Sequence, residues 1–434
     1  MPVKLNYSDA NFQKDFTDLL SSKREMDEDV DQVVADILSD VRKRGDDAVL
    51  DYTAKFDRLE LTRDSMRISA TDLANAATNC DPEVYGALEM AADRIRSFHA
   101  KTLPAGLSYT DDQGVKLGAR WRAVQSAGLY VPGGTAAYPS SVLMNAMPAK
   151  VAGVERLVMV VPTPDGVINQ AVLAAAHLSG VSEVYSIGGA QAVGALAYGT
   201  DTIKPVDKIV GPGNAYVAAA KRRVFGVVGI DMIAGPSEIL VVADGQNDPQ
   251  WIAMDLLSQA EHDISAQSIL ITNDSEFALA VEGAVEGILK TLPRSEIASE
   301  SWNKHGAIIL VPTLDDAVAL VDHIAPEHLE LAVDNPEEMA DKITNAGAIF
   351  LGRYTPEAIG DYVAGPNHVL PTARSARFSS GLGVLDFMKR TSLVGCDADS
   401  LRKIGPAAVK LAVAEGLGAH ARSVAVRLNL PVED

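Results

Sequence analysis

The sequence predicts an α/β protein with two tandem Rossmann-like lobes, each a partial doubly wound unit, and with helical regions at both ends. Three observations predict this class. From about Tyr130 onward, short β-branched apolar runs alternate with alanine-rich stretches of helical spacing. A second series of the same kind begins at Glu238, and the segments outside the two series have mainly helical spacing. Strands that alternate with helices are typical of a parallel sheet with crossover helices.

The composition restricts the partners and the location that the protein can have. With 434 residues and 47% hydrophobic content, the chain can bury a large core and is too long for one ordinary domain. Its 38 basic and 58 acidic residues give a net charge of -20, which repels nucleic-acid phosphates and anionic lipids. We therefore expect neither a nucleic-acid nor a membrane partner. The start lacks a signal peptide, no apolar run reaches about 18 residues, and Cys80 and Cys396 have no paired spacing, so we expect a reducing cytoplasm.

The first region is predicted to be mostly helical. We expect residues 1–25 to form an N-terminal extension and residues 26–128 to form a helical segment that packs with the second lobe. Apolar positions recur at helical spacing from Val30 and stop at Gly45, a natural C-terminal cap. Another helix is predicted to begin at Asp81, which can cap it and is followed by a proline.

The first α/β lobe is predicted over residues 129–236, and its strands end in glycine-rich turns. A turn between a strand and a helix lets backbone N–H groups and the helix N-terminus meet an anion such as a pyrophosphate, so three turns together indicate a nucleotide. None matches G-x-G-x-x-G and no P-loop is present, so a tight βα connection explains each turn alone equally well. The turns are YVPGG (Tyr130 to Gly134), IGGAQAVG (Ile187 to Gly194) and GPGNAY (Gly211 to Tyr216).

The second α/β lobe is predicted over residues 237–381 and contains a candidate metal-binding pair. In the stretch LLSQAEHD, Gln259 and His262 are three residues apart on a predicted helix, so their side chains lie on one side of it. A glutamine oxygen and an imidazole nitrogen could form half of a zinc site. A packed or solvated histidine is the simpler alternative for this fragment alone.

An adjacent acid and imidazole stand out further along this lobe. Glu327 and His328 lie in the otherwise apolar stretch IAPEHLEL. Burial of both is costly unless they have partners, so an interior position would indicate function. A helix start with a solvated Glu-His pair is the alternative. Further candidate ligands are Asp361, His368 and His420.

The last region, residues 382–434, is predicted to be helical, with a break at Gly416-Leu417-Gly418. The final helix, from Ala419 to Leu428, has too few large apolar residues to form a domain by itself. We therefore expect it to dock on another surface.

Eight motifs occur in order along the chain: YVPGGTAAYPSSVLMNAMPAKVAGV, GGAQAVGALAYGT, VDKIVGPGNAYVAAAKR, IDMIAGPSE, QAEHD, IAPEHLEL, GDYVAGPNHVLPT and EGLGAHARS. Together they resemble the motifs of the histidinol dehydrogenase family. They cover nearly the whole chain from about residue 25, and the ordered set is far more specific than any one turn. The resemblance implies an enzyme that oxidises L-histidinol to L-histidine in two NAD-dependent steps, the last reactions of histidine biosynthesis, with one zinc ion per subunit. It also implies a homodimer in which the C-terminal region, 382–434, closes the partner's active site.

The same resemblance implies roles for individual residues. Glu327 and His328 match the catalytic acid–base pair. The implied zinc ligands are Gln259, His262, Asp361 and His420. The implied NAD contacts, in the first lobe, are Tyr130, Gln191 and Asn214. The implied substrate contacts are Ser237, His368 and Glu415, together with His328 and the four zinc ligands.

The chemistry is consistent with these residue types. Oxidation of an alcohol to an acid needs two hydride transfers with addition of water to the aldehyde between them. A cysteine could make that addition, but Cys80 and Cys396 lie far from the motifs. An imidazole such as His328 suits the base role, and a carboxylate in a partly dry site, Glu327, suits activation of water. We interpret zinc mainly as a clamp for the substrate.

Three alternatives share part of the pattern. A related zinc and NAD dehydrogenase could act on another polar alcohol, such as a sulfonated diol, although Glu415, which can pair with an amine, favours histidinol. A zinc hydrolase would leave the glycine-rich turns unexplained, and a non-catalytic nucleotide-binding regulator would leave the Glu-His pair unexplained. The choice between NAD and NADP stays open because the usual ribose-reading acid is not identifiable.

Overall fold

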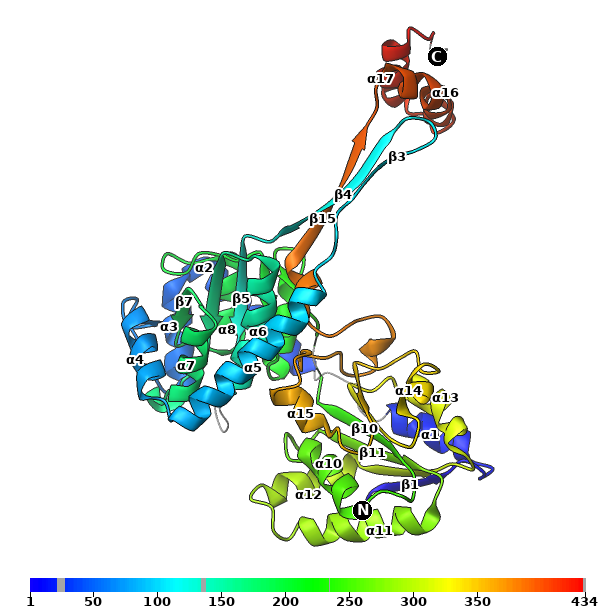
Figure 1. Ribbon diagram of the computed structural model, residues 1–434. Helices are drawn as coiled ribbons and strands as arrows, with labels where there is room; N and C mark the ends of the chain where they lie inside the picture. Colours follow the sequence, from blue (N-terminus) through cyan, green and yellow to red (C-terminus); the bar gives the residue numbers. More distant parts are fainter. Residues whose placement is uncertain (22–27, 134–137, 234, 432–434) are drawn as a thin grey trace. The chain divides into compact units, whose positions relative to one another are not determined.

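The computed structural model describes residues 1–21, 28–133, 138–233 and 235–431 (Figure 1). The chain separates into two compact units. The first comprises Met1–Thr102 and Gln125–Phe387, and the second comprises Leu103–Val124 and Met388–Asp434. No helix in the described ranges combines the length and the apolar character that a membrane span requires.

The first unit contains two six-stranded sheets with related topology. The first sheet has the order β2-β7-β6-β5-β8-β9, and all of its pairs are parallel except β2 with β7. Its strands are β2 (Arg67–Ile68), β5 (Ser126–Tyr130), β6 (Arg156–Val160), β7 (Glu183–Tyr185), β8 (Lys208–Val210) and β9 (Gly229–Ile230). The helices between β5 and β9 are α6 (Pro139–Ala152), α7 (Gln170–Leu178), α8 (Gly189–Tyr198) and α9 (Ala215–Val224). Every residue of β5 is buried, as expected for a strand covered on both faces.

The second sheet has the order β1-β12-β11-β10-β13-β14 and is wholly parallel. Its strands are β1 (Val3–Asn6), β10 (Glu238–Ala243), β11 (Gln267–Thr272), β12 (Ala307–Leu310), β13 (His328–Ala332) and β14 (Ala348–Leu351). Its helices are α10 (Pro249–Ala260), α11 (Ser275–Ile288), α12 (Ser295–His305), α13 (Leu314–Ile324), α14 (Pro336–Ala340) and α15 (Glu357–Tyr362). In each sheet the first strand of the series lies between the second and the fourth, which is the doubly wound arrangement. The predicted fold class of two tandem Rossmann-like lobes is confirmed.

The N-terminal segment differs from its prediction. Residues 1–25 were expected to form an extension, but β1 pairs with β12 at the edge of the second sheet. Phe12, Phe16 and Leu19 of α1 (Phe12–Ser21) join the core of that sheet. Residues 22–27 lie outside the described ranges. An edge strand of four residues is held by backbone hydrogen bonds, which leave little signature in the side-chain pattern.

The prediction that segment 26–128 packs with the second lobe is wrong for most of its helices, although Arg94 of α5 also contacts that lobe. Its helices pack on the first lobe, where Val34, Ile37, Leu38 and Val41 share a core with residues of α8 and α9. An apolar stripe shows that one face of a helix is buried but does not specify the surface that buries it. The helices are α2 (Glu28–Arg44), α3 (Asp46–Asp57), α4 (Ala70–Asn79) and α5 (Pro82–Lys101).

The second unit consists of a three-stranded antiparallel sheet and two helices. Its strands are β3 (Leu107–Thr110), β4 (Lys116–Ala123) and β15 (Met388–Gly395), and its helices are α16 (Ala398–Ala414) and α17 (Gly418–Leu428). The helices pack closely, since a Cβ added at Gly405 would lie 2.5 Å from Cδ1 of Leu428. Neither the β3–β4 hairpin nor β15 was predicted. Most of their side chains are exposed or half-buried, so these strands lack the apolar alternation that reveals a half-buried strand.

Candidate functional site

The three glycine-rich turns of the first lobe follow β5, β7 and β8, at the carboxyl edge of the first sheet. The Tyr130 hydroxyl, at the end of β5, accepts a hydrogen bond of 3.0 Å from the backbone N–H of Gly189 at the start of α8. Gly211, after β8, has a φ of +112°, and a Cβ added there would lie 2.1 Å from the carbonyl oxygen of Tyr130. Ligands of doubly wound sheets bind at this edge, between the first and fourth strands. Gly134 of the first turn lies outside the described ranges.

The polar side chains at these turns have distinct environments. Burial raises the pKa of Tyr130 to about 12, so its phenol stays protonated at neutral pH. Gln191 is buried, and its Oε1 has no hydrogen-bond partner among the described residues. The Asn214 side chain caps α9, because its Oδ1 accepts from the N–H groups of Tyr216 (3.1 Å) and Val217 (3.2 Å). The helix N-termini and the unpaired amide oxygen make this edge suitable for a polar ligand.

A buried ion pair that the sequence did not reveal fixes the Gly211 turn. Asp231 accepts a hydrogen bond of 2.8 Å from Gly211 N–H, and Lys221 donates one of 2.9 Å to the Gly211 carbonyl. The two side chains also pair with each other, and both are almost fully buried. The only sequence signal is a lysine within the apolar run YVAAAK.

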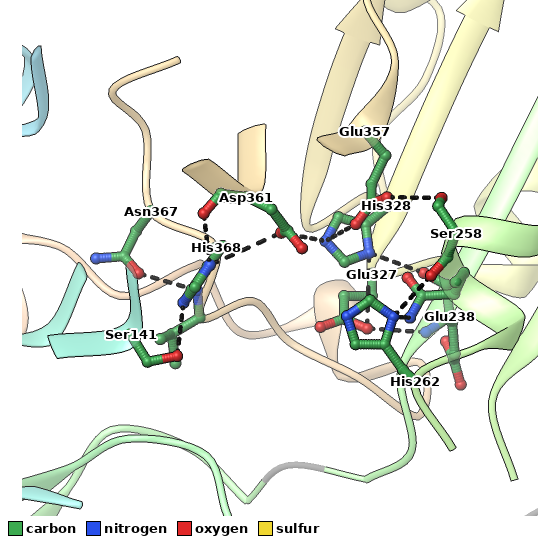
Figure 2. A network of polar contacts seen from close by, with 12 residues as sticks. Ser141, Glu238, Ser258, His262, Glu327, His328, Glu357, Asp361, Asn367 and His368 are labelled. Carbon is green, nitrogen blue, oxygen red and sulfur yellow. Dashed lines mark hydrogen bonds and ion pairs between the residues drawn. The ribbon is translucent and has the colours of Figure 1, made fainter. Parts of the chain in front are cut away.

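Glu327 and His328 lie together at the amino end of β13, in the second lobe (Figure 2). His328 is 4% exposed, and its Nδ1 lies 3.0 Å from the carbonyl oxygen of Glu238. Since a carbonyl can only accept, Nδ1 donates and Nε2 carries the free lone pair. Nε2 has no hydrogen-bond partner in the described part of the chain. Burial lowers the pKa of His328, so the imidazole is neutral at neutral pH.

The same backbone residue also orients Glu327. The backbone N–H of Glu238 donates to Glu327 Oε2 at 2.8 Å, and this oxygen lies 3.7 Å from His328 Nδ1. Burial raises the pKa of Glu327 well above its ordinary value. The pair is therefore buried, and the backbone of Glu238 holds both side chains, Glu327 through its N–H and His328 through its carbonyl. These contacts exclude the alternative of a solvated Glu-His pair at a helix start.

Gln259 and His262 come together at the end of α10, as their spacing predicted. Their Nε2 and Nδ1 atoms are 3.4 Å apart, and His262 Nδ1 lies 2.9 Å from the Ser258 carbonyl oxygen. Nδ1 therefore donates to that carbonyl, which leaves His262 Nε2 available as a ligand. Gln259 is buried, and its Oε1 has no partner among the described residues.

A third group of possible ligands faces His328. One oxygen each of Glu357 and Asp361 and Nε2 of His328 lie within 4.8 Å of one another. His328 Nε2 is 3.7 Å from Glu357 Oε1 and 3.9 Å from Asp361 Oδ1. Burial, followed by the charge of Asp361, raises the pKa of Glu357 to about 9. Crowded carboxylates and unpaired donor atoms of this kind fit a divalent cation, which would offset their repulsion.

Glu357 was missed by sequence reasoning. Its Oε2 accepts from the Ser258 hydroxyl at 3.2 Å, while its Oε1 is buried without a hydrogen-bond partner in the described ranges. The available signal was its position four residues before Asp361, which places both carboxylates on one face of a helix.

The four remaining residues with predicted site roles lie in different parts of the chain. His368 Nδ1 lies 3.0 Å from the Asp361 carbonyl oxygen, and its Nε2 lies 3.3 Å from the Ser141 hydroxyl. Ser237 is half-buried, immediately before Glu238. Glu415 and His420 belong to the second unit, at the end of α16 and in the first turn of α17, where both are exposed. Their membership of the site stays a prediction.

Comparison with known proteins gives one consistent family. A family model described as Histidinol dehydrogenase matches residues 20–428. The chain is 67% identical over 430 residues to a histidinol dehydrogenase from Rhodospirillum rubrum, with 99% of each sequence covered. It is 63% identical over 433 residues to one from Rhizobium meliloti, with 100% of each covered. The crystal structure of histidinol dehydrogenase from Elizabethkingia anophelis matches with a TM-score of 0.94 at 38% identity, covering 99% of this chain and 98% of that one.

Proposed function

The chain belongs to the histidinol dehydrogenase family and is an oxidoreductase, and from this premise we propose that it oxidises L-histidinol to L-histidine through histidinaldehyde in two NAD-dependent steps. The observation that carries this proposal is the buried, neutral His328 beside Glu327, with its free Nε2 directed at the Glu357–Asp361 pair. A base with a free lone pair next to carboxyl groups suits proton removal from an alcohol held by polar contacts.

We propose that His328 acts as the base in both oxidations. In the first, Nε2 takes the hydroxyl proton while the carbinol hydride leaves, so the alcohol becomes the aldehyde. In the second, Nε2 takes a proton from the aldehyde hydrate while the second hydride leaves, so the hydrate becomes the acid. When bound, NAD accepts each hydride. The donation from Nδ1 to the Glu238 carbonyl holds the imidazole in the tautomer that this role requires.

We propose that Glu327 activates the water that adds to the aldehyde. Its raised pKa matches the task of taking a proton from water, which an ordinary carboxylate does poorly. Glu327→Gln should therefore impair the second oxidation more than the first. The carboxamide keeps the shape of the side chain but cannot take a proton.

Two assays of the same variant test this division. The formation of reduced nicotinamide is followed by absorbance, once from histidinol in a single turnover and once from supplied histidinaldehyde. The assay that starts from histidinol controls for the folding of the variant and for its binding of ligands, so an additional loss with histidinaldehyde reports on the second oxidation. Equal losses in both assays would show that the two steps share one base.

We propose that zinc is held by Gln259, His262 and Asp361, with His420 supplied by the partner subunit. The unpaired Gln259 Oε1 and the available His262 Nε2 support this donor set. When bound, zinc supplies a fixed positive charge that positions the imidazole and amine of the substrate. Glu357, beside Asp361, is a further oxygen donor at the same place.

Removal of the metal by a chelator should abolish activity, and added zinc should restore it, with the fold largely retained. The proposed ligands Gln259 and His262 lie at the end of α10, a helix that packs on an extensive apolar core, unlike the ligands of a small zinc finger. Activity and far-ultraviolet circular dichroism are measured on the same samples. Cooperative unfolding of the chelated protein would show that the metal has a structural role instead.

We propose that residues 129–236 form the NAD-binding lobe, with Tyr130, Gln191 and Asn214 as cofactor contacts. The meeting of the three turns at the switch edge of the first sheet supports this assignment. Residues 237–381 then carry the metal and catalytic groups.

We further propose a homodimer in which residues 382–434 of each subunit close the partner's site, with Ser237, His368 and Glu415 among the substrate contacts. Exposed apolar side chains on the helices of the second unit support a docking role for that region; they include Leu411, Val413 and Val426.

A parallel assay with histidinol and with a sulfonated diol, each with NAD and NADP, tests the substrate and the cofactor together. Turnover of the diol but not of histidinol would overturn the proposed function.

A further inference from the structure

A proline inside α6 leaves one backbone carbonyl of that helix without its ordinary partner. In an α-helix the N–H of residue 148 would bond to the carbonyl of Met144, but Pro148 has no N–H. Met144 and Pro148 lie in a fully buried stretch of the helix. A buried carbonyl without a donor is costly, so another group is expected to supply one.

Asn367 supplies that donor from a distant part of the sequence. Its Nδ2 donates to the Met144 carbonyl at 2.6 Å, and its Oδ1 accepts from the N–H of Val369 at 2.9 Å. Both ends of this buried carboxamide are therefore used. One end holds α6 of the first lobe, and the other shapes the segment that carries His368.

His368 lies between the same helix and the candidate metal site (Figure 2). Its Nε2 lies 3.3 Å from the hydroxyl of Ser141, which precedes Met144 by three residues and so shares a face of α6 with it. Its Nδ1 lies 3.0 Å from the carbonyl oxygen of Asp361. Loss of the hydrogen bond between Asn367 and Met144 would therefore change the position of His368 relative to Asp361.

Another first-lobe contact holds the start of the same segment. The Arg94 guanidinium, on α5, donates to the carbonyls of Val363 and Ala364, the latter at 3.2 Å. Gly365, which follows, has a φ of +114° and packs against α5, where an added Cβ would lie 3.2 Å from the Arg94 carbonyl oxygen. The segment 363–369 is thus attached to α5 at its start and to α6 at its end.

We propose that Asn367 is a positioning residue for the oxidation of histidinol, and that Pro148 reserves the Met144 carbonyl for it. The bond between them fixes His368 relative to Asp361 and couples the packing of the first lobe to the substrate side of the site. This inference rests on the proposed contact of His368 with the substrate.

The test compares Asn367→Leu with the double variant Asn367→Leu/Pro148→Ala. The single change removes the donor, so it should lower the thermal midpoint and reduce kcat/KM for histidinol by about 10- to 100-fold, with KM for NAD unchanged. In the double variant, the alanine introduced at position 148 brings an N–H that can bond to the Met144 carbonyl within the helix. We expect the thermal midpoint to recover in part, since the N–H of Val369 still lacks its acceptor, while kcat/KM stays low because the segment is still detached from α6. Recovery of both together would overturn the proposal, since Asn367 would then have only a structural role.

Two controls complete the design. Asn169→Ala removes a side chain that caps α7, an interaction outside the polar network around His368, and should lower the thermal midpoint without changing kcat/KM. If Asn367→Leu does not fold, Asn367→Ala is compared in the same way. Wild-type kcat/KM in His368→Ala would overturn the proposed role of His368 and the positioning role with it. Impaired His368→Ala with unimpaired Asn367→Leu would overturn the positioning role alone.

Discussion

Replacement of His328 by asparagine is expected to lower kcat/KM for histidinol by about 10²- to 10⁴-fold, the usual contribution of a positioned base. The asparagine amide can still donate to the Glu238 carbonyl, as Nδ1 does in the wild type. It has no group at the position of Nε2, which we propose takes the substrate protons. Both half-reactions should be impaired, in contrast to Glu327→Gln.

The pH dependence gives this prediction a second readout. Burial lowers the pKa of His328 below the ordinary histidine value of 6.5, so the base form persists to a lower pH than in a solvated histidine. In the wild type, kcat/KM should fall only as the pH drops through that lowered pKa. The residual kcat/KM of His328→Asn should not show this fall at low pH.

His323→Asn is a matched control for this substitution. His323 is exposed on α13, and its Nδ1 lies 2.7 Å from the Ala319 carbonyl oxygen, so the same kind of local hydrogen bond is preserved in the control. Its kcat/KM should equal that of the wild type. A His328→Asn enzyme within about fivefold of the wild type would assign the base role to another group.

Two inactive variants are expected to restore activity when they are mixed. His262→Ala and His420→Ala should each be inactive alone, because each lacks one proposed zinc ligand. If His420 enters the partner's site, a mixed dimer has one site with both histidines intact and one site that lacks both. Random exchange makes about half of the dimers mixed, so activity near one quarter of the wild type is expected if the sites act independently.

Subunit exchange is confirmed independently by native mass spectrometry of a mixture in which one variant is labelled with nitrogen-15, because the two variants otherwise have the same mass. A mixture of His262→Ala with Gln259→Ala serves as the control, because both residues lie at the end of α10 in the same chain and the two changes should not complement. Confirmed exchange without recovery in the first mixture would mean that each chain supplies its own His420. The shared site would then be rejected, while the assignments within the first unit would stand.

Much of the candidate site follows from local sequence rules. Gln259 and His262 meet because they are three residues apart across the end of α10 and the turn that follows it, whatever packs around that helix. The start of α13 is similar, since Thr313 and Asp316, three residues apart in the sequence, form a capping box. The interior position of Glu327 and His328 could be expected from the apolar residues on both sides of the pair.

By itself, the sequence determined the features that depend on near neighbours in the chain: the alternation of strands and helices, their caps, the turns after strands and the residues that share a helix face. Only the tertiary structure decided which surfaces meet. It assigned β1 to the second sheet and α2 to the first lobe, and it placed Asn367 on the Met144 carbonyl. The physical reason is that a side-chain pattern encodes the period and the degree of burial of an element. Its partner is selected by shape and by backbone hydrogen bonds between segments that can lie hundreds of residues apart.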